Sequence, residues 1–202
     1  MAKVGIFYGS TTGVTEDIAN RIAEKIDGAE VFNIDGDVLI LGTSTWGFGD
    51  LQDDWQAVLD DLANLNLAGK KVAYFGSGDQ GTFSDTFMDG MAIINEEISK
   101  TGATVIGNTS TEGYEFNESR AVKGDKFLGL ALDEVNQSDL TDERIDAWVE
   151  EIKKEWGDEI DKIPENKYPQ GVFVLDGGNS RDYTKLSKKY LKMIQEVLEA
   201  PE

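Results

Sequence analysis

The stretch Ser10-Thr11-Thr12-Gly13-Val14-Thr15 follows directly on the apolar run Val4-Gly5-Ile6-Phe7-Tyr8. The run predicts a buried strand and the pattern after Thr15 predicts an amphipathic helix, so the stretch is the turn between them. Such a turn directs backbone N–H groups, side-chain hydroxyls and the partial positive charge of a helix start at one spot, which suits a phosphate. A helix cap rich in Ser and Thr has the same appearance. On the turn alone, both interpretations stay open.

The turn lacks the features of a nucleoside-triphosphate loop. It contains no Lys and no Gly-Lys-Ser/Thr ending, and that ending is what places a cation on the phosphates in such loops. A phosphate held by neutral donors alone suggests a tightly held monophosphate cofactor rather than a phosphoryl group that is transferred.

Composition limits the classes of function. The 202 residues carry a formal charge of -20, with a pI near 4.2. This charge argues against nucleic acid or an anionic membrane as partner and favours basic protein surfaces, with an association rate that falls as salt rises. The chain has no Cys and no His, so disulfides, thiolate metal sites and histidine bases are excluded. We expect a cytoplasmic protein, because no signal peptide or long apolar run is present.

Short apolar runs alternate with helical patterns, which predicts a parallel α/β sheet. The expected strands are residues 3–8, 30–34, 38–41, 71–76, 104–107 and 127–132, and the expected helices are residues 15–25, 53–65, 85–101 and 141–155. In open parallel sheets the ligand lies outside the carboxyl ends of the strands. The loops at those ends are therefore where we look for a site.

The character of the chain changes near Gly157. All three prolines lie beyond it, and residues 157–202 hold 9 acidic and 7 basic residues, which leaves 30 acidic and 12 basic among residues 1–156. We expect residues 1–156 to form one domain, residues 157–170 to form a linker, and residues 171–202 to form an appended β–α unit on the same domain. Within that unit, a strand is expected at 171–175 and a helix at 180–198.

Three loops at strand carboxyl ends carry the chemistry. The first is the opening turn, the second is residues 43–50 (Thr-Ser-Thr-Trp-Gly-Phe-Gly-Asp), and the third is residues 76–83 (Gly-Ser-Gly-Asp-Gln-Gly-Thr-Phe). Trp46 and Phe83 are each an aromatic residue on a glycine-rich polar loop, where a flat ligand can be covered. Either aromatic alone fits a peripheral core residue. Together with the turn, the loops predict a site for a planar ring linked to a monophosphate.

The chain resembles the long-chain flavodoxins, which are FMN-dependent electron carriers. The resemblance covers about residues 2–156 and rests on separated blocks in order: 9–15, 41–55, 76–87, 113–116, 129–134, 136–137, 140–141 and 144–145. It implies a doubly wound parallel sheet in the order 2-1-3-4-5, with FMN at the switch point between the first and third strands.

The resemblance implies a role for particular residues. Ser10 to Thr15 would hold the FMN phosphate, while Trp46 and Phe83 would flank the ring; the family usually has Tyr where Phe83 stands. Backbone groups near Gly47, Phe48 and Asp79 would contact the ring edge, and the Gly47 carbonyl can turn toward N5–H on reduction. The candidate cofactor-binding residues are Ser10, Thr11, Thr12, Gly13, Val14, Thr15, Thr43, Ser44, Thr45, Trp46, Gly47, Phe48, Gly49, Ser77, Gly78, Asp79, Phe83 and Asp85. Residues 108–126 match the long-chain insertion.

The expected mechanism needs no catalytic residue and no metal, since the flavin supplies the redox chemistry. Accumulated negative charge disfavours adding more, so the second one-electron reduction is expected at low potential. The resemblance implies basic redox partners, such as a flavodoxin reductase and oxidoreductase acceptors. Carboxylates that could orient a partner are Asp50, Asp53, Asp54, Glu112 and Glu115, although a solvated acidic face explains any single one as well.

One feature departs from the family. Only Asp35-Gly36-Asp37 separates the strand expected at 30–34 from the next, whereas a parallel crossover normally needs a dozen or more residues. Three arrangements are open. The tail strand 171–175 takes the sheet edge while 30–34 becomes a loop, residues 1–34 complete the sheet of a second molecule, or a hairpin forms at Asp35-Gly36. The chain is thus expected to be a monomer or a segment-swapped homodimer. The deletion and the unusual tail suggest an engineered or recombined chain.

Three functions are compatible with the sequence. The first is a low-potential, FMN-binding one-electron carrier, or a derivative that retains the site. The second is a flavodoxin-like scaffold with altered topology and no electron-transfer role, and the third is an FMN-dependent reductase. The three loops leave no obvious substrate pocket and the acidic charge suits protein docking, so the carrier is the function that we expect.

Overall fold

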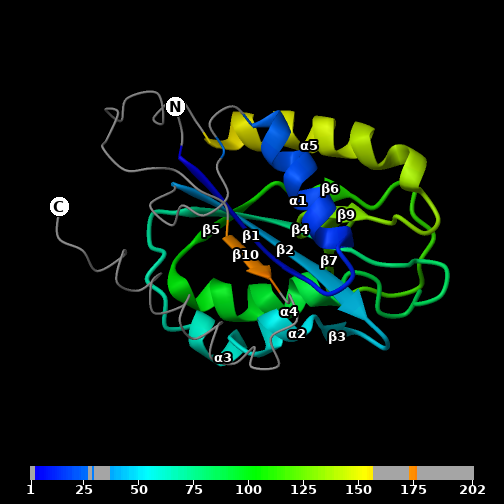
Figure 1. Cartoon of the computed structure of the whole chain (residues 1–202), viewed down its shortest axis with the longest axis horizontal. Coiled ribbons are helices and arrows are strands. Elements are labelled where there is room, and N and C mark those ends of the chain that lie inside the picture. Colours follow the sequence, from blue (N-terminus) through cyan, green and yellow to red (C-terminus); the bar gives the residue numbers. More distant parts are fainter. Residues whose placement is uncertain (1–2, 27–28, 30–36, 157–172, 177–202) are drawn as a thin grey trace.

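The computed structural model describes residues 3–26, 29, 37–156 and 173–176, and it has a parallel sheet at its centre (Figure 1). The strand order is β10-β1-β2-β4-β5, with β9 also paired to β4 and β3 paired antiparallel to β2. The strands of this sheet are β1 (Val4–Ser10), β2 (Val38–Trp46), β3 (Asp50–Leu51), β4 (Lys71–Ser77), β5 (Thr104–Ile106), β9 (Leu130–Leu132) and β10 (Phe173–Asp176). The predicted α/β class with parallel strands is confirmed.

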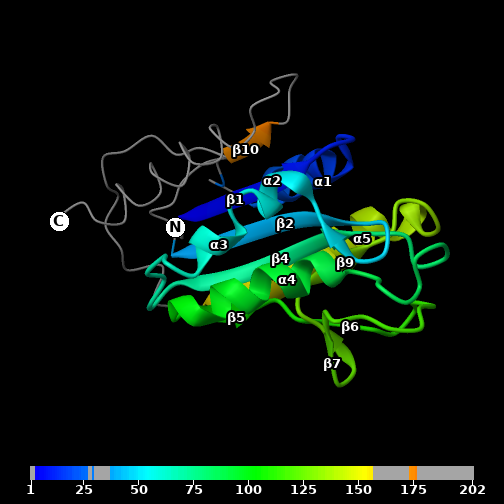
Figure 2. The same cartoon turned by 90° about the horizontal axis from the view of Figure 1, so that it is seen from below.

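Helices cover both faces of the sheet (Figures 1 and 2). One face carries α1 (Val14–Lys25) and α5 (Thr141–Trp156), and the other carries α2 (Asp53–Gln56), α3 (Leu59–Leu62) and α4 (Asp89–Ile98). Successive residues of β1 alternate between the faces, so Ile6 packs in the cluster that includes Ile18, and Phe7 packs in the cluster that includes Trp55. Burial on both faces explains why these strands are continuous apolar runs.

Two expected helices differ from the structure. The helix expected at 53–65 is divided into α2 and α3, because the chain tightens at Val58, whose N–H bonds the Trp55 carbonyl 3.1 Å away, three residues back. The helix expected at 85–101 begins only at Asp89, since Met88 has φ +66° and a helix cannot continue through that conformation. It ends in a 3₁₀ turn, Ser99–Thr101.

The strand expected at 127–132 is also interrupted. Phe127 ends β8 (Lys126–Phe127), which forms a small antiparallel sheet with β6 (Thr109–Ser110) and β7 (Val122–Lys123). Leu130 then begins β9. Between them, a Cβ on Gly129 would lie 2.1 Å from the Tyr74 carbonyl oxygen, so only glycine allows this approach to β4. Residues 108–126, which the resemblance matches to the long-chain insertion, are not all on the surface: Ala121 is fully buried, and Tyr114 and Phe116 pack against the core.

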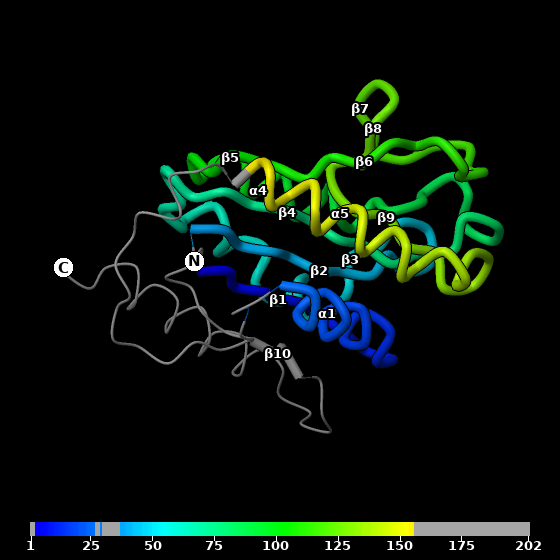
Figure 3. The backbone as a smooth tube through the Cα atoms, turned by 90° about the horizontal axis from the view of Figure 1, so that it is seen from above, coloured from blue at the N-terminus to red at the C-terminus, as the bar shows by residue number. Residues whose placement is uncertain are grey.

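The edge of the sheet next to β1 is taken by β10. The two strands are parallel, with Phe7 aligned to Phe173 and Ser10 to Asp176 (Figure 2). On its other side β1 pairs with β2, which runs beside it in Figure 3. This order is that of the first of the three arrangements, in which the tail strand lies at the edge. The expected strand 30–34, linker 157–170 and helix 180–198 lie outside the described residues.

The turn after β1 positions the start of α1. Gly13 has φ +87°, which a residue with a side chain adopts only with strain, and α1 begins at the next residue. The helix then packs on β1 and α5 through Ile18, Ala19 and Ile22. Among the helices of the described residues, none is long and apolar enough to cross a bilayer.

Candidate functional site

The carboxyl ends of β1, β2 and β4 lie side by side, because these strands are consecutive in the sheet and parallel. The three predicted loops leave from these ends. The Thr15 hydroxyl lies 3.3 Å from the Ser77 hydroxyl, which joins the first loop to the third. The Gln52 Nε2 group donates to the Thr11 hydroxyl at 3.2 Å, which joins the first loop to the segment after the second. The structure therefore brings the three loops together.

The turn from Ser10 to Thr15 is an array of neutral donors. The Gly13 N–H donates to Ser10 Oγ at 3.1 Å, and the first helical bond runs from the Asp17 N–H to the Gly13 carbonyl at 2.9 Å. Helix geometry leaves the N–H groups before Asp17 without helical acceptors. Thr11, Thr12 and Val14 are exposed and Thr15 is buried. A small anion at this point would meet hydroxyls, N–H groups and the positive end of α1.

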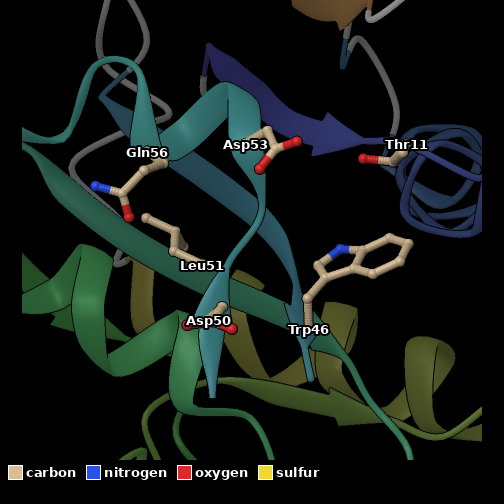
Figure 4. A pocket seen from close by; sticks show the side chains of 6 residues that line it. All are labelled: Thr11, Trp46, Asp50, Leu51, Asp53 and Gln56. Carbon is tan, nitrogen blue, oxygen red and sulfur yellow. The ribbon is translucent and has the colours of Figure 1, made fainter. Parts of the chain in front are cut away.

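A pocket of about 400 Å³ lies between this turn and the start of α2 (Figure 4). Its lining residues are Thr11, Trp46, Asp50, Leu51, Asp53 and Gln56. The Trp46 ring extends from the end of β2 toward the turn that carries Thr11, while Asp53 and Gln56 come from α2 on the opposite side. The volume falls within the range of about 300–1,000 Å³ that is usual for small-molecule sites.

Three aromatic residues lie on the predicted loops. The Trp46 side chain is 40% exposed, and its Nε1 donates to Ser44 Oγ at 2.7 Å. Phe48 is 92% exposed, and its ring is perpendicular to that of Phe83 with centroids 6.4 Å apart. Exposing the apolar ring of Phe48 to water costs free energy unless a ligand or partner covers it. These rings are therefore available to a planar ligand.

The backbone of the second loop is fixed by a hydrogen bond from helix α4 and by one within the loop. Thr45 Oγ1 accepts the Gly90 N–H of α4 at 3.0 Å, and the Gly49 N–H donates to the Trp46 carbonyl at 3.1 Å. Gly47 and Gly49 have φ +48° and +105°, so both conformations favour glycine. Thr43, which begins the loop, is buried.

The third loop is held by hydrogen bonds to the carboxylate of its own residue Asp79. Asp79 Oδ1 accepts the N–H groups of Gly81 and Thr82 at 3.0 and 2.9 Å, and it accepts Asn136 Nδ2 at 2.9 Å. Burial by itself would raise the pKa of Asp79, but these hydrogen bonds outweigh it and lower the pKa below its ordinary value. The fully buried Asp133 accepts the Gln80 N–H at 3.0 Å. The third loop is therefore held in its conformation by hydrogen bonds within the protein.

Two predicted positions lie elsewhere. Asp85 accepts Asn117 Nδ2 of the insertion at 2.8 Å, so its carboxylate is engaged away from the turn. Asp54 was expected among the surface carboxylates and this is wrong: it is 4% exposed and accepts Gln52 Nε2 at 2.8 Å. The other four carboxylates of that group, Asp50, Asp53, Glu112 and Glu115, are exposed.

Sequence reasoning missed Gln52 as a site residue. It is 2% exposed and contacts both the turn and α2. The available signal was its place directly before Asp53-Asp54-Trp55, where a side chain that caps the helix is needed. Gln is not among the preferred capping residues, so the sequence pattern alone gave it no special weight.

Comparison with known proteins agrees with this geometry. The protein-family model described as Flavodoxin matches residues 6–148. A flavodoxin of Synechococcus elongatus is 47% identical over 169 residues, covering 78% of this chain and 99% of the relative, and a flavodoxin of Trichodesmium erythraeum is 48% identical over 170 residues, with the same coverage. The crystal structure of Fusobacterium nucleatum flavodoxin bound to flavin mononucleotide matches with a TM-score of 0.72 and 36% identity, over 77% of this chain and 99% of that one.

The fold and the three converging loops define a doubly wound α/β protein with a small-molecule site at the carboxyl edge of its sheet. The matched residues and relatives make the identification specific: the chain belongs to the flavodoxin family. The match to the Synechococcus relative spans 169 aligned positions, but 78% of 202 residues is about 158, so about 11 positions have no residue here. That shortfall agrees in size with a missing crossover of a dozen residues.

Proposed function

We propose that the turn from Ser10 to Thr15 holds the phosphate of FMN and that Trp46 and Phe83 flank its ring. Membership of the flavodoxin family makes the chain an FMN-binding electron carrier rather than an enzyme, as the sequence predicted. The observation that carries the residue assignment is the contact of Thr15 with Ser77, because it joins the phosphate turn to the loop that ends in Phe83. Nothing in the comparisons favours a scaffold without electron transfer or a reductase.

The donor set of the turn fits a phosphate monoester. Ser10 Oγ accepts the Gly13 N–H, so its own O–H proton remains for an outside acceptor. The nearby cation Arg21 is held by Asp17, Glu134 and Asp142 at 3.3, 3.8 and 2.8 Å, and so it is occupied by carboxylates. The phosphate would be bound by neutral hydroxyls, by N–H groups and by the helix dipole, which suits a group that stays bound.

The region around the second and third loops fits a flat ring. The pocket has Trp46 on one wall, and Phe83 contacts the exposed Phe48. The glycines of both loops let backbone N–H and carbonyl groups approach a ligand closely. Residues 43–49, together with Ser77, Gly78 and Asp79, would supply these backbone contacts. Asp85, whose carboxylate bonds Asn117, would act at most through the shape of the third loop.

FMN supplies reversible one-electron chemistry when bound, and the protein sets how easily each electron is taken up. The chain contributes negative charge: its net charge is -20, and Asp50 and Asp53 line the pocket. An electron taken up by FMN bound here would lie near these carboxylates and the phosphate, so the protein would disfavour the second reduction and shift it to low potential. Stacking against Trp46 disfavours the electron-rich ring in the same direction.

The partners are redox proteins, and we propose that they are basic, for example a flavodoxin reductase. This rests on the charge of the chain and on the exposed Asp50, Asp53, Glu112 and Glu115 around the loops. Complementary charge raises the association rate more than the affinity. Electron transfer to a basic partner should therefore slow steeply between 50 and 500 mM salt, on the order of tenfold or more, whereas an acidic partner should show no such dependence.

Reconstitution tests the proposal directly. The apoprotein is titrated with FMN and with riboflavin, which lacks the phosphate, and binding is followed by quenching of flavin fluorescence. FMN should bind at least about a hundredfold more tightly, since several hydrogen bonds to a charged group are involved. Stepwise reduction with dithionite should then show two separate one-electron steps. Equal affinity for the two flavins would overturn the phosphate assignment, and steady NADPH oxidation without an added reductase would favour an enzyme.

Four expectations from the sequence stay predictions. They are the cytoplasmic location, the choice between a monomer and a segment-swapped homodimer, the origin of the chain by engineering or recombination, and the division into a domain (1–156), a linker (157–170) and an appended β–α unit (171–202). Light scattering on the flavin-bound protein addresses the second, because a 22.2 kDa species rules out the swap.

A further inference from the structure

Gln52 is buried between the phosphate turn and α2, and its orientation is fixed by its surroundings. The side chain is 2% exposed. Its Oε1 accepts the N–H groups of Asp54 and Trp55 at 3.0 and 3.4 Å, which caps the first turn of α2. If the amide were turned over, its NH₂ group would face these two N–H donors, so only one orientation is possible.

In that orientation both hydrogens of Nε2 are used. One is donated to Asp54 Oδ2 at 2.8 Å and the other to Thr11 Oγ1 at 3.2 Å. The strand end also packs directly on this amide, because a Cβ on Gly9 would lie 2.0 Å from Gln52 Oε1. Gln52 is thus a rigid link between the turn after β1 and the segment after the loop that carries Trp46.

The link determines which way the Thr11 hydroxyl can act. A hydroxyl has one hydrogen and two lone pairs. Since Gln52 donates to one lone pair, the hydrogen of Thr11 is left to point elsewhere, and Thr11 is an exposed residue that lines the pocket. The hydrogen of the Ser10 hydroxyl is likewise left for another acceptor, because Ser10 Oγ accepts the Gly13 N–H.

We propose that Gln52 is a positioning residue that fixes the Thr11 hydroxyl as a hydrogen-bond donor to the FMN phosphate. The inference rests on the proposed function, in which this turn holds the phosphate. It adds that the buried amide of Gln52, which lies outside the turn, makes the Thr11 hydroxyl of the turn a hydrogen-bond donor to the ligand. It also makes phosphate binding sensitive to the start of α2, since the same amide caps that helix.

A charge-neutral exchange of two side chains tests this. In the double variant Gln52→Glu, Asp54→Asn the two residues trade amide and carboxylate, so size and net charge are kept and a carboxylate oxygen still accepts the N–H groups of α2. The oxygen that now faces Thr11 can only accept, so the Thr11 hydrogen is drawn away from the ligand. FMN affinity should fall about 10- to 100-fold, the value of one hydrogen bond to a charged group. Riboflavin affinity should change less than twofold.

The Thr11→Val background separates positioning from simple charge repulsion. The exchange moves a carboxylate from position 54 to position 52, next to the turn, so charge repulsion would lower FMN affinity in the Thr11→Val background as well. If Gln52 acts only by positioning the Thr11 hydroxyl, the exchange should cause no further loss once that hydroxyl is absent. A loss that persists in Thr11→Val, or an equal loss for riboflavin, overturns the inference. If Thr11→Val itself leaves FMN affinity unchanged, the phosphate assignment fails instead.

A matched control and a second measurement complete the test. Asn95→Leu removes another amide that bonds a hydroxyl, that of Tyr74 at 3.2 Å, on α4; the ratio of FMN to riboflavin affinity should not change. In the unaltered protein, the side-chain NH₂ signals of Gln52 in a ¹⁵N NMR spectrum should shift on adding FMN or inorganic phosphate, but not riboflavin. Signals that do not respond to phosphate would contradict the proposal even if the double variant fails to fold.

Discussion

The hydroxyl of Thr15, at the start of α1, lies 3.3 Å from the hydroxyl of Ser77, at the end of β4, although the two residues are 62 positions apart in the sequence. Both side chains are at most 6% exposed. One hydroxyl donates to the other, so one of the two hydrogens remains for a third group. The pair is thus a buried junction between the turn proposed to hold the phosphate and the loop proposed to cover the ring.

Substitution at this junction should weaken FMN binding selectively. Thr15→Val keeps the shape of the side chain but removes the hydroxyl, and it leaves Ser77 without its partner. We expect FMN affinity to fall about 5- to 30-fold, because a buried hydrogen bond is lost beside a charged ligand. Titration with FMN and riboflavin measures this. Thr12→Val, at an exposed position of the same turn, should have a smaller effect; the reverse order would contradict the geometry.

Trp46 should act on both flavins alike. Trp46→Ala removes a ring whose stacking contributes about 0.5–1.5 kcal/mol beyond simple burial. FMN and riboflavin should each lose about 3- to 30-fold in affinity, and the potential of the second reduction step should rise because the electron-rich ring is less disfavoured. Trp46→Phe should retain most of both properties. A change confined to FMN would place Trp46 near the phosphate instead, and spectroelectrochemical titration provides the potentials.

Proline substitutions in β10 should show whether its pairing with β1 stabilises the protein. In a strand, consecutive N–H groups point to opposite sides, so one of Val174 and Leu175 directs its N–H toward β1 and the other does not. Val174→Pro and Leu175→Pro should therefore differ, by about 1–3 kcal/mol in the free energy of unfolding, because proline removes one ladder hydrogen bond. Urea unfolding measures the difference. Two small and equal effects would argue that the edge strand contributes little.

Tyr114 should make stability fall at high pH. Burial raises the pKa of Tyr114 to about 12, from an ordinary value of 10.0. The raised pKa leaves the free energy of unfolding unchanged below pH 10. As the pH rises from 10 toward 12, the free energy of unfolding falls, because only the unfolded chain releases the phenol proton in that range. The loss should approach about 2–3 kcal/mol. Tyr114→Phe should flatten this part of the profile, although it also removes the hydrogen bond to the Ala131 carbonyl at 2.5 Å.

The sequence predicted much of the site because its signals are local. A strand, a hydroxyl-rich turn and a helix start are adjacent in the chain, and Gly13 with φ +87° and α1 from Val14 lie where the pattern placed them. The break between α2 and α3 at Val58 was not predictable in this way. The residues from 53 to 65 have a helical pattern, and only packing of Trp55, Val58 and Leu62 under the sheet tightens the chain there.

The residues missed or misplaced depend on contacts between distant segments. Asp54 has the sequence surroundings of a surface carboxylate, but in the fold it is buried and accepts a hydrogen bond from the amide of Gln52. Phe48 was expected to act through its backbone, yet its exposed ring contacts Phe83, 35 residues later. No periodicity in a single segment reports such pairings, since they are determined by which strand ends meet at one edge.

The sequence by itself determined the α/β class, the family and the three loops that form the site, because alternation of apolar runs, glycine-rich turns and helix starts is encoded residue by residue. It left open which strand pairs with β1, since residues 30–34 and 171–175 both have strand patterns. Only the tertiary structure decided that Phe173–Asp176 lies there and that Gln52 bonds Thr11. Both are long-range pairings, and their energy depends on packing and hydrogen-bond geometry that no local pattern contains.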